Sequence, residues 1–408
     1  MNYDGIIIGG GPAGLYAAIH AANAGRKVLL LEQNGRLGKK LLITGKGRCN
    51  VTNHCSVEEV LQNIPRNSRF LFSAMHAHPP ADVESFFENH GCPLKVERGN
   101  RVFPLSDRSQ SILDALTAAA KSTGVHVRTG RVEKLLTEEG KICAVSIGKE
   151  RIPCSWVILA TGGLSYPTTG STGDGYRMAQ ALGHSIVPCQ GSLVPLETDG
   201  PDCPDMQGLA LKNAGVRLVN AAGKTLYKDF GELLFTHFGV SGPTVLSTSA
   251  HLNGQCSLHI DLKPALDEGK LDARILRDLD TYRNRTMENA LTDLLPRSMI
   301  PVVLRRLDID PSMQANSLKK QDRKRLTALL KDFCVPIVGK RPVAEAIITS
   351  GGIKTSEVNP KTMESKLIHG LYFAGEILDC DAYTGGFNLQ IAWATAYAAA
   401  TAAAQASK

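Results

Sequence analysis

The pattern of apolar positions near the start of the chain predicts a strand, a helix and a second strand. The first apolar run, Gly5–Ile8, is continuous rather than alternating, which is typical of a strand covered on both faces of a parallel sheet. An alanine-rich helical segment follows Gly14, and a second continuous run, Val28–Leu31, ends at Glu32. Strand, helix and strand in this order predict a βαβ unit with parallel strands.

The rest of the chain changes pattern twice. Short strands and turns follow one another closely from 193 to 261, whereas 267–332 is charged, helical and almost free of glycine. Glycine-rich turns return from 342, before an alanine-rich helix near the C-terminus. We therefore expect an α/β protein in which a nucleotide-binding domain (1–190 and 342–408) is split by an inserted β domain (191–266 and 333–341) and a helical domain (267–332).

Composition and cysteine spacing bear on where the protein is located and which ligands it binds. The chain has 408 residues, a formal net charge of +7 and ten cysteines, none of them in a Cys-x-x-Cys pair. A chain of this length does not need disulfide staples, so we expect reduced thiols and a cytoplasmic location. We find no apolar segment that could span a bilayer and no cluster with metal-ligand spacing, so we expect neither a membrane nor a metal. The mild positive charge is too weak to predict nucleic-acid binding, and the oligomeric state is not indicated.

The first strand leads into the segment GGGPAG (9–14), which has the spacing of a dinucleotide-binding turn. In such a turn Gly9 allows the tight bend, Gly11 lets the backbone approach a pyrophosphate, and Gly14 lets the helix pack on the strand. The helix N-terminus adds free N–H groups and partial positive charge for the phosphates. Glu32, at the end of the second strand, can accept hydrogen bonds from a ribose hydroxyl. The alternative is a glycine-rich turn that binds nothing.

Two further glycine-rich elements are expected at the same edge of the sheet. An apolar strand ends in Ala160, Thr161, Gly162 and Gly163, and a later strand ends in Gly375 and Glu376. A carboxylate at the second position suits a polyol, and a helix beginning near Gly386 would direct its positive end at a ring oxygen. A flavin, with its ribityl chain and pyrimidine edge, meets both needs. We therefore predict FAD rather than NAD as the resident cofactor.

Several long segments carry a family resemblance. They are GGGPAG at 9–14, LGKKLLITGKGRCNVTN at 37–53, RVFP at 101–104, ATGGLSYPTTGSTGDG at 160–175, LLFTHFGVSGP at 233–243 and NPKTMESKLIHGLYFAGEILDCDAYTGGFN at 359–388. In these segments the chain resembles the BaiN/YhiN-like flavoproteins, described as aminoacetone-oxidase-like enzymes or 3-dehydro-bile-acid reductases. The resemblance implies a Rossmann-like, glutathione-reductase-type FAD domain, an inserted β-barrel-like domain and a small helical domain.

Motif and resemblance together predict the residues that contact FAD. Where the more general flavoprotein pattern has an aspartate after the late glycine, this chain has Glu376 with Asp379 nearby, so either carboxylate is a candidate for the ribityl chain. The predicted contacts are Gly9, Gly11, Pro12, Ala13, Gly14, Glu32, Gln33, Lys39, Lys40, Gly45, Gly47, Arg48, Cys49, Asn50, Val132, Ala160, Thr161, Gly162, Gly163, Gly375, Glu376, Asp379, Gly386, Phe387 and Asn388.

The resemblance leaves the reaction open. An NAD(P)H-linked reductase would pass a hydride through flavin N5 to a conjugated enone and would need an acid for the neighbouring carbon. Tyr166, His237 and Tyr383 lie in or beside the motifs and are candidates, although each is more often a packing or loop residue, and His237 more often a core histidine. NADH or NADPH would bind transiently, and the substrate would be a small molecule. The alternatives are an amine oxidase that uses O₂ and, more remotely, an RNA-modifying flavoprotein supported only by the basic run 319–325.

Overall fold

A computed structural model describes residues 3–406 and divides them into two compact units. The first unit comprises the chain up to Ser192 and again from Val343 onward, and the second comprises Leu193–Pro342. A unit made from both ends of the chain is thus interrupted by one long insertion. Each unit has its own hydrophobic core.

A five-stranded parallel sheet forms the centre of the first unit. Its strand order is β19-β10-β1-β2-β6, with all neighbouring strands parallel. The strands are β1 (Gly5–Ile8), β2 (Val28–Glu32), β6 (His126–Thr129), β10 (Trp156–Leu159) and β19 (Leu371–Phe373). The three central strands are almost wholly buried, as their continuous apolar sequences require when helices and loops cover both faces.

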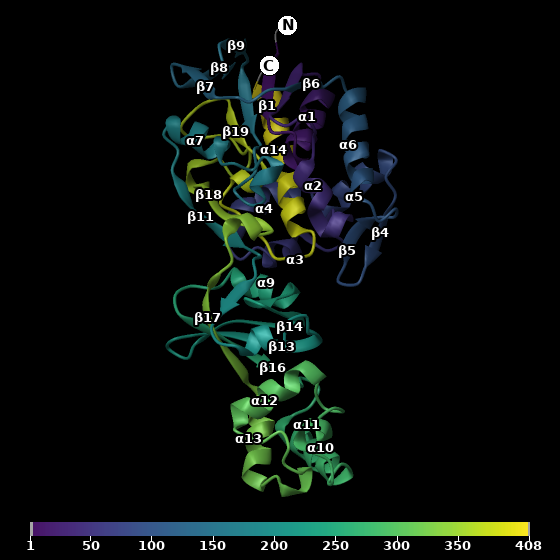
Figure 1. Cartoon of the computed structure of the whole chain (residues 1–408). Coiled ribbons are helices and arrows are strands. Elements are labelled where there is room, and N and C mark those ends of the chain that lie inside the picture. The colour runs from purple at the N-terminus through teal and green to yellow at the C-terminus, as the bar shows by residue number, and fades with distance from the viewer. Residues whose placement is uncertain (1–2, 407–408) are drawn as a thin grey trace. The chain divides into compact units, whose positions relative to one another are not determined.

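Helix α1 (Pro12–Asn23) and the terminal helix α14 (Phe387–Ala406) pack against each other beside this sheet (Figure 1). Both are rich in alanine, whose small side chain allows close approach, and α14 is buried on most of its sides. Helix α6 (Ser109–Ser122) also packs on α1. The first and last segments of the chain therefore meet around the start of α1.

Smaller elements complete the first unit. Its further helices are α2 (Lys39–Ile43), α3 (Val57–Gln62), α4 (Ser68–Ala77), α5 (Pro80–Asn89) and α7 (Asp174–Ala181). Two three-stranded antiparallel sheets are formed by β3 (Thr52–Asn53), β4 (Leu94–Glu97) and β5 (Arg101–Pro104), and by β7 (Lys134–Glu138), β8 (Lys141–Ile147) and β9 (Glu150–Pro153). An antiparallel ribbon pairs β11 (Ile186–Ser192) with β18 (Ile348–Ile353).

The second unit is a closed six-stranded barrel joined to a group of helices. The barrel order is β12-β15-β14-β13-β16-β17, formed by Leu196–Thr198, Gly239–Ser241, Thr225–Thr236, Ala210–Asn220, Cys256–Asp261 and Phe333–Lys340. The helices are α8 (Asp202–Asp205), α9 (Pro243–Ser249), α10 (Glu268–Thr281), α11 (Met287–Ala290), α12 (Ile300–Leu307) and α13 (Lys320–Lys331). One core joins barrel residues such as Leu258 to helix residues such as Leu271.

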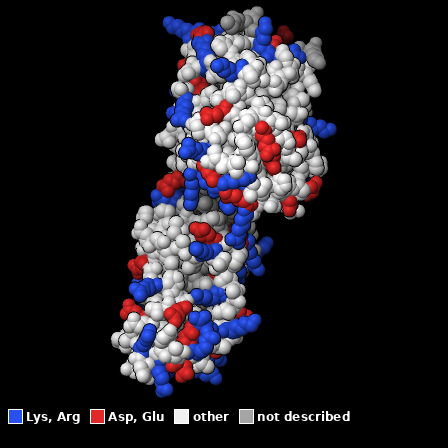
Figure 2. Space-filling model, turned by 90° about the vertical axis from the view of Figure 1, so that its right-hand side faces the viewer, with Lys and Arg blue, Asp and Glu red and all other residues white. Residues whose placement is uncertain are grey.

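The expected fold class is confirmed: a Rossmann-like parallel sheet, an inserted barrel and a helical part. The finer division of the insertion into a β domain and a helical domain stays a prediction. None of the helices in residues 3–406 is long and apolar enough to cross a membrane. On the face drawn in Figure 2, positive and negative side chains are interspersed rather than separated into fields of one sign.

Candidate functional site

A pocket lies at the carboxyl ends of the parallel strands, where α/β sheets place their ligands. Its empty volume is about 1250 Å³, part of which is open to solvent. Three glycine-rich turns line it at 9–11, 160–162 and 374–376, and the first turns of α2 and α14 and residues of 130–132, 169–171 and 347–348 form more of its wall. Glycine-rich turns at the ends of parallel strands are typical of dinucleotide-binding sites.

The first turn leaves α1 with an open N-terminus. Gly9 has a φ of 110°, and a Cβ at Gly14 would stand 1.8 Å from the Gly9 carbonyl oxygen, so no side chain fits there. A Cβ at Gly11 would meet nothing within 4 Å, because this residue borders the open pocket. Within residues 3–406 no side chain caps α1, so its first N–H groups are available to an anion such as a pyrophosphate.

Glu32 ends β2 beside this turn and is held in place by three donors. Its Oε2 accepts a hydrogen bond from the Gly10 N–H at 2.7 Å, and its Oε1 accepts from the N–H and the Nδ2 of Asn34 at 2.8 and 2.7 Å. The carboxylate lines the pocket with its orientation fixed. It can accept a further hydrogen bond from a ribose hydroxyl, as the sequence predicts.

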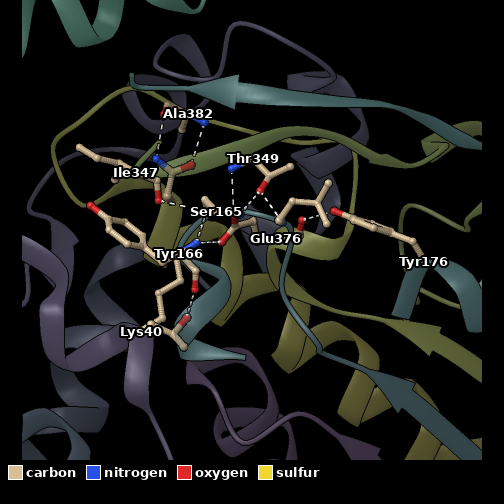
Figure 3. Close-up of polar contacts among 11 residues, drawn as sticks. Lys40, Ser165, Tyr166, Tyr176, Ile347, Thr349, Glu376 and Ala382 are labelled. Atoms are coloured by element: carbon tan, nitrogen blue, oxygen red, sulfur yellow. Dashed lines mark hydrogen bonds and ion pairs between the residues drawn. The ribbon is translucent and has the colours of Figure 1, made fainter. Parts of the chain in front are cut away.

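At the other end of the pocket a polar network joins four segments that are distant in sequence (Figure 3). Glu376 Oε1 accepts hydrogen bonds from the Thr349 N–H at 2.9 Å and from Ser165 Oγ at 2.8 Å. Lys40 Nζ forms an ion pair with Glu376 Oε2 at 2.5 Å and donates to Ser165 Oγ at 2.6 Å. The side chains of Lys40 and Glu376 are only 19% and 12% exposed, so their charges are paired within the wall of the pocket.

The two carboxylates considered for the ribityl chain, Glu376 and Asp379, differ in their position relative to the pocket. Glu376 lines the pocket, whereas Asp379 does not and is instead bonded by Asn67 Nδ2 at 2.9 Å. Burial raises the pKa of Asp379, although the hydrogen bond from Asn67 opposes this. Of the two, Glu376 is therefore the carboxylate available to a ligand in the pocket.

One segment runs along the pocket between these two groups. Ser165 belongs to the network around Glu376, while the carbonyl oxygens of Thr169 and Gly170 accept hydrogen bonds from Asn34 Nδ2 at 3.1 Å and Gln33 Nε2 at 2.7 Å. Thr169 and Gly170 also line the pocket. Residues 165–170 are thereby attached at one end near Glu376 and at the other near Glu32.

Many of the predicted contact residues lie on the pocket wall. They are Gly9, Gly11, Pro12, Ala13, Glu32, Gln33, Lys39, Lys40, Val132, Ala160, Thr161, Gly162, Gly375, Glu376 and Asn388. The others lie outside the lining: Gly14, Gly45, Gly47, Arg48, Cys49, Asn50, Gly163, Asp379, Gly386 and Phe387. Gly14 and Gly163 lie directly behind the wall, since a Cβ at Gly14 would stand 1.8 Å from the Gly9 carbonyl oxygen and one at Gly163 would stand 2.9 Å from Glu376 Oε1. Whether any of them contacts a cofactor stays a prediction.

Arg48 and Cys49 both lie outside the pocket lining, and each has its own surroundings in the fold. The Arg48 guanidinium forms ion pairs with Glu97 and Asp107 and lies 4.2 Å from the ring centroid of Phe103. Cys49 is fully buried, and burial raises the pKa of its thiol to about 12. The charge of Arg48 is thus neutralised locally, and Cys49 fills space in the core as an unreactive thiol.

The three candidate acids lie outside the pocket lining. Tyr166 follows Ser165 directly and is partly exposed, and Tyr383 is partly buried, with its N–H donating to the Asn63 carbonyl oxygen at 3.0 Å. His237 belongs to the second unit and is exposed, so the interpretation as a core histidine is wrong. The buried apolar residue of that segment is Phe235, two positions earlier.

Sequence reasoning missed the side chains that order the site. Asn34, Ser165 and Thr349 each bond a predicted residue or the turn that carries it. Each stands within two residues of a predicted contact or a glycine pair, which is the only local signal they offer. Their partners are set by tertiary folding, which one sequence does not display.

The features of the pocket fit a flavin dinucleotide. The uncapped start of α1 suits the pyrophosphate, Glu32 the ribose, and Glu376 beside the start of α14 the ribityl chain and ring. Glycines stand where a side chain would fill the turn or the pocket.

Comparison with known proteins places the chain in a family. Residues 3–402 match the family model described as the HI0933-like protein Rossmann domain. A 3-dehydro-bile acid Δ4,6-reductase of Clostridium scindens is 32% identical, over 99% of this chain and 100% of the relative. A ribosomal RNA dihydrouridine synthase of Escherichia coli is 31% identical, over 98% of this chain and 97% of the relative.

Solved flavoenzymes share the fold at low identity. A 3-ketosteroid Δ1-dehydrogenase of Sterolibacterium denitrificans superposes with a TM-score of 0.53 at 14% identity, over 99% of this chain and 100% of that chain. A 3-ketosteroid Δ4-(5α)-dehydrogenase of Rhodococcus jostii gives 0.50 at 17% identity, over 99% and 97%. These likenesses concern the fold alone.

Proposed function

The chain belongs to the HI0933-like family and is an FAD-dependent oxidoreductase, and on that premise we propose that it reduces a C=C bond conjugated to a carbonyl group. In this proposal the substrate is a small molecule of the 3-oxo-ene kind, and NADH or NADPH supplies the electrons. Bound FAD would carry two electrons from the nicotinamide to the substrate as a hydride.

The names of the two full-length relatives support this reaction class. A Δ4,6-reductase of a 3-dehydro-bile acid acts on double bonds conjugated with a 3-oxo group. A dihydrouridine synthase saturates the uracil C=C bond next to a carbonyl. Both products require a hydride at one carbon and a proton at its neighbour. The two relatives share this chemistry but not the substrate, so they support the reaction class rather than one substrate.

The observation that carries the proposal is the network around Glu376. A charge pair held by Ser165 and Thr349 lies at the wall of the pocket, and it supports assigning the ring of a flavin to this end. In our proposal Glu376 orients the ribityl chain, and Lys40 keeps the pair neutral in a poorly hydrated place. The N-terminus of α14 would stabilise negative charge that develops on the ring during reduction.

An anaerobic experiment tests the reaction. Purified protein is mixed with NADH or NADPH, and the flavin absorbance is followed before and after addition of a 3-oxo-4-ene steroid. We expect bleaching by the nicotinamide and reoxidation by the steroid without oxygen. Bleaching by an amine, with peroxide release in air and no reaction with the steroid, would instead identify an amine oxidase.

A second candidate is reduction of uracil in ribosomal RNA. It is favoured by the relatives of that name and by Lys319, Lys320 and Lys324, which are exposed at the start of α13. Arg323 and Arg325 of the same run are paired with Asp272 and Asp322, which reduces the charge available to phosphates. RNA binding that weakens steeply with salt, and dihydrouridine in ribosomal RNA after incubation, would favour this candidate.

A further inference from the structure

Tyr166 has a backbone conformation that a tyrosine rarely adopts. Its φ and ψ are 52° and 60°, in the left-handed region that disfavours residues with a Cβ. A bulky residue stays in this region only when its surroundings hold it there, and such positions cluster at functional sites. The conformation therefore raises the question of what the tyrosine does.

The residue before it is fixed by the network at the pocket. Ser165 is fully buried, its N–H donates to Thr349 Oγ1 at 3.0 Å, and its Oγ bonds both Glu376 and Lys40. Glu376 and Lys40 line the pocket, so Ser165 sits directly behind its wall. The position of Tyr166 is thereby tied to the cofactor site.

The residues after it form a tight turn. Thr169 donates from its N–H and from its Oγ1 to the Tyr166 carbonyl oxygen, at 2.9 and 2.7 Å. Pro167 opens this turn, and Thr169 and Gly170 return to the pocket wall. Bonds on both sides of Tyr166 thus hold its strained backbone and fix the direction of its Cα–Cβ bond.

The phenol is free to act on a ligand. Figure 3 shows the ring of Tyr166 extending on the side away from Glu376, and the residue is partly exposed. Its phenolic oxygen forms no hydrogen bond with any residue between 3 and 406, unlike Ser165 next to it. An O–H group without a partner, on a rigid support beside the pocket, is suited to donate to a bound molecule.

We propose that Tyr166 is the proton donor of the reductive step, and this assignment rests on the proposed function. Reduced FAD, when bound, would supply a hydride whose two electrons form the C–H bond at the β-carbon of the substrate. The electron pair of the C=C bond then forms a C–H bond at the α-carbon with the phenolic proton. The tyrosinate that remains regains a proton from water, to which the partly exposed side chain has access.

Comparing two substrates with the same six-membered ring distinguishes proton donation by Tyr166 from its other possible roles. The enzyme with reduced FAD is mixed anaerobically with cyclohex-2-enone or with 1-nitrocyclohexene, and flavin reoxidation is followed. The anion formed by hydride addition to the nitroalkene is stable, so that reaction needs no acid. We expect Y166F to react with the enone about 10²–10⁴-fold more slowly and with the nitroalkene at nearly the wild-type rate.

The possible results distinguish between roles of Tyr166. Equal slowing of both reactions would mean that Tyr166 only positions the substrate, and unchanged enone reduction would overturn the assignment. Selective loss with Y383F rather than Y166F would move the role to Tyr383. If neither compound reoxidises the wild-type flavin, the proposed reaction class fails, and the assignment fails with it.

Thermal unfolding without cofactor tests the backbone argument separately. Y166G and Y166A both remove the ring, but only alanine keeps the Cβ that disfavours a positive φ. We expect Y166G to unfold at a higher temperature than Y166A, and both to be soluble and folded. The reverse order would show that residue 166 is unstrained, and it would remove the reason for assigning the tyrosine a function.

Discussion

Lys40 and Glu376, 336 residues apart in sequence, form an ion pair in the wall of the pocket. Lys40 belongs to α2 in the early part of the chain, and Glu376 follows β19 near its end. The pair therefore links the two parts of the chain that build the cofactor site. Because both side chains are mostly buried, neither charge is well hydrated when its partner is removed.

Removing one member of this pair should weaken FAD binding. In K40M the carboxylate of Glu376 keeps its hydrogen bonds from Thr349 and Ser165 but loses its cation. We expect the Kd for FAD to rise about tenfold to a hundredfold, corresponding to about 1.4–3 kcal/mol. The measurement is flavin fluorescence during titration of the cofactor-free protein. The double variant K40M/E376Q should lose less than the sum of the single variants, and additive losses would contradict a direct coupling.

Substitutions at two glycines of the first turn should have different effects, one on FAD binding and the other on stability. A side chain at Gly11 meets open space in the pocket, so G11V should keep the wild-type unfolding curve and bind no FAD. A Cβ at Gly14 stands 1.8 Å from the Gly9 carbonyl oxygen, so G14A should lower the free energy of unfolding by about 1–3 kcal/mol. Urea unfolding and the flavin absorbance of the purified proteins distinguish the two. A G11V protein that remains yellow would show that the pyrophosphate does not approach this turn.

The turns of the site could be predicted because their signals are local. The segment at 9–14 combines an apolar strand, three glycines with fixed spacing and a helix start, and each feature has one physical purpose. Glu32 follows from the same βαβ unit. The fold class could also be predicted, since continuous apolar runs predict a parallel sheet that is covered on both faces.

The side-chain partners could not be predicted, because they depend on the tertiary fold. The resemblance predicts Arg48 as a cofactor contact, but nothing in the sequence indicates that folding gives it Glu97 and Asp107 as partners. Ser165 and Thr349 looked like ordinary loop and strand residues, yet they carry the network around Glu376. Residue type and spacing therefore located the pocket, while the interactions inside its wall required the structure.

Asp379 should make the stability of the protein depend on pH. Burial raises its pKa above the ordinary value of 3.8, and nearby Asp381 raises it further, while Asn67 and Arg66 oppose the shift. The folded chain thus keeps a proton that the unfolded chain has released. This contribution is fully present below pH 3.8 and is lost as pH rises through the folded pKa.

The isosteric variant D379N isolates this effect. Its amide can still accept the hydrogen bond from Asn67, but it never becomes charged. We expect the stability of D379N relative to the wild type to increase as pH is raised from about 4 to 8, measured by urea unfolding. Parallel stability curves would show that the Asp379 carboxyl has its ordinary pKa when folded.

His78, which is buried, and His20, which is partly buried, should produce the opposite dependence at acid pH. Burial lowers their pKa values from 6.5 to about 3 and about 4, and the ring of His78 bonds the Tyr16 hydroxyl at 2.6 Å. Below pH 6.5 the histidines of the unfolded chain bind protons, whereas those of the folded chain stay neutral. The free energy of unfolding therefore decreases as pH falls towards the folded pKa values.

His20 Nε2 is buried and has no hydrogen-bond partner among the described residues, so phenylalanine can replace it without breaking a bond at that atom. We expect H20F to match the wild type near pH 8 and to exceed it by up to about 3 kcal/mol at pH 4, measured by urea unfolding. The same acid loss in both proteins would mean that His20 is protonated in the fold.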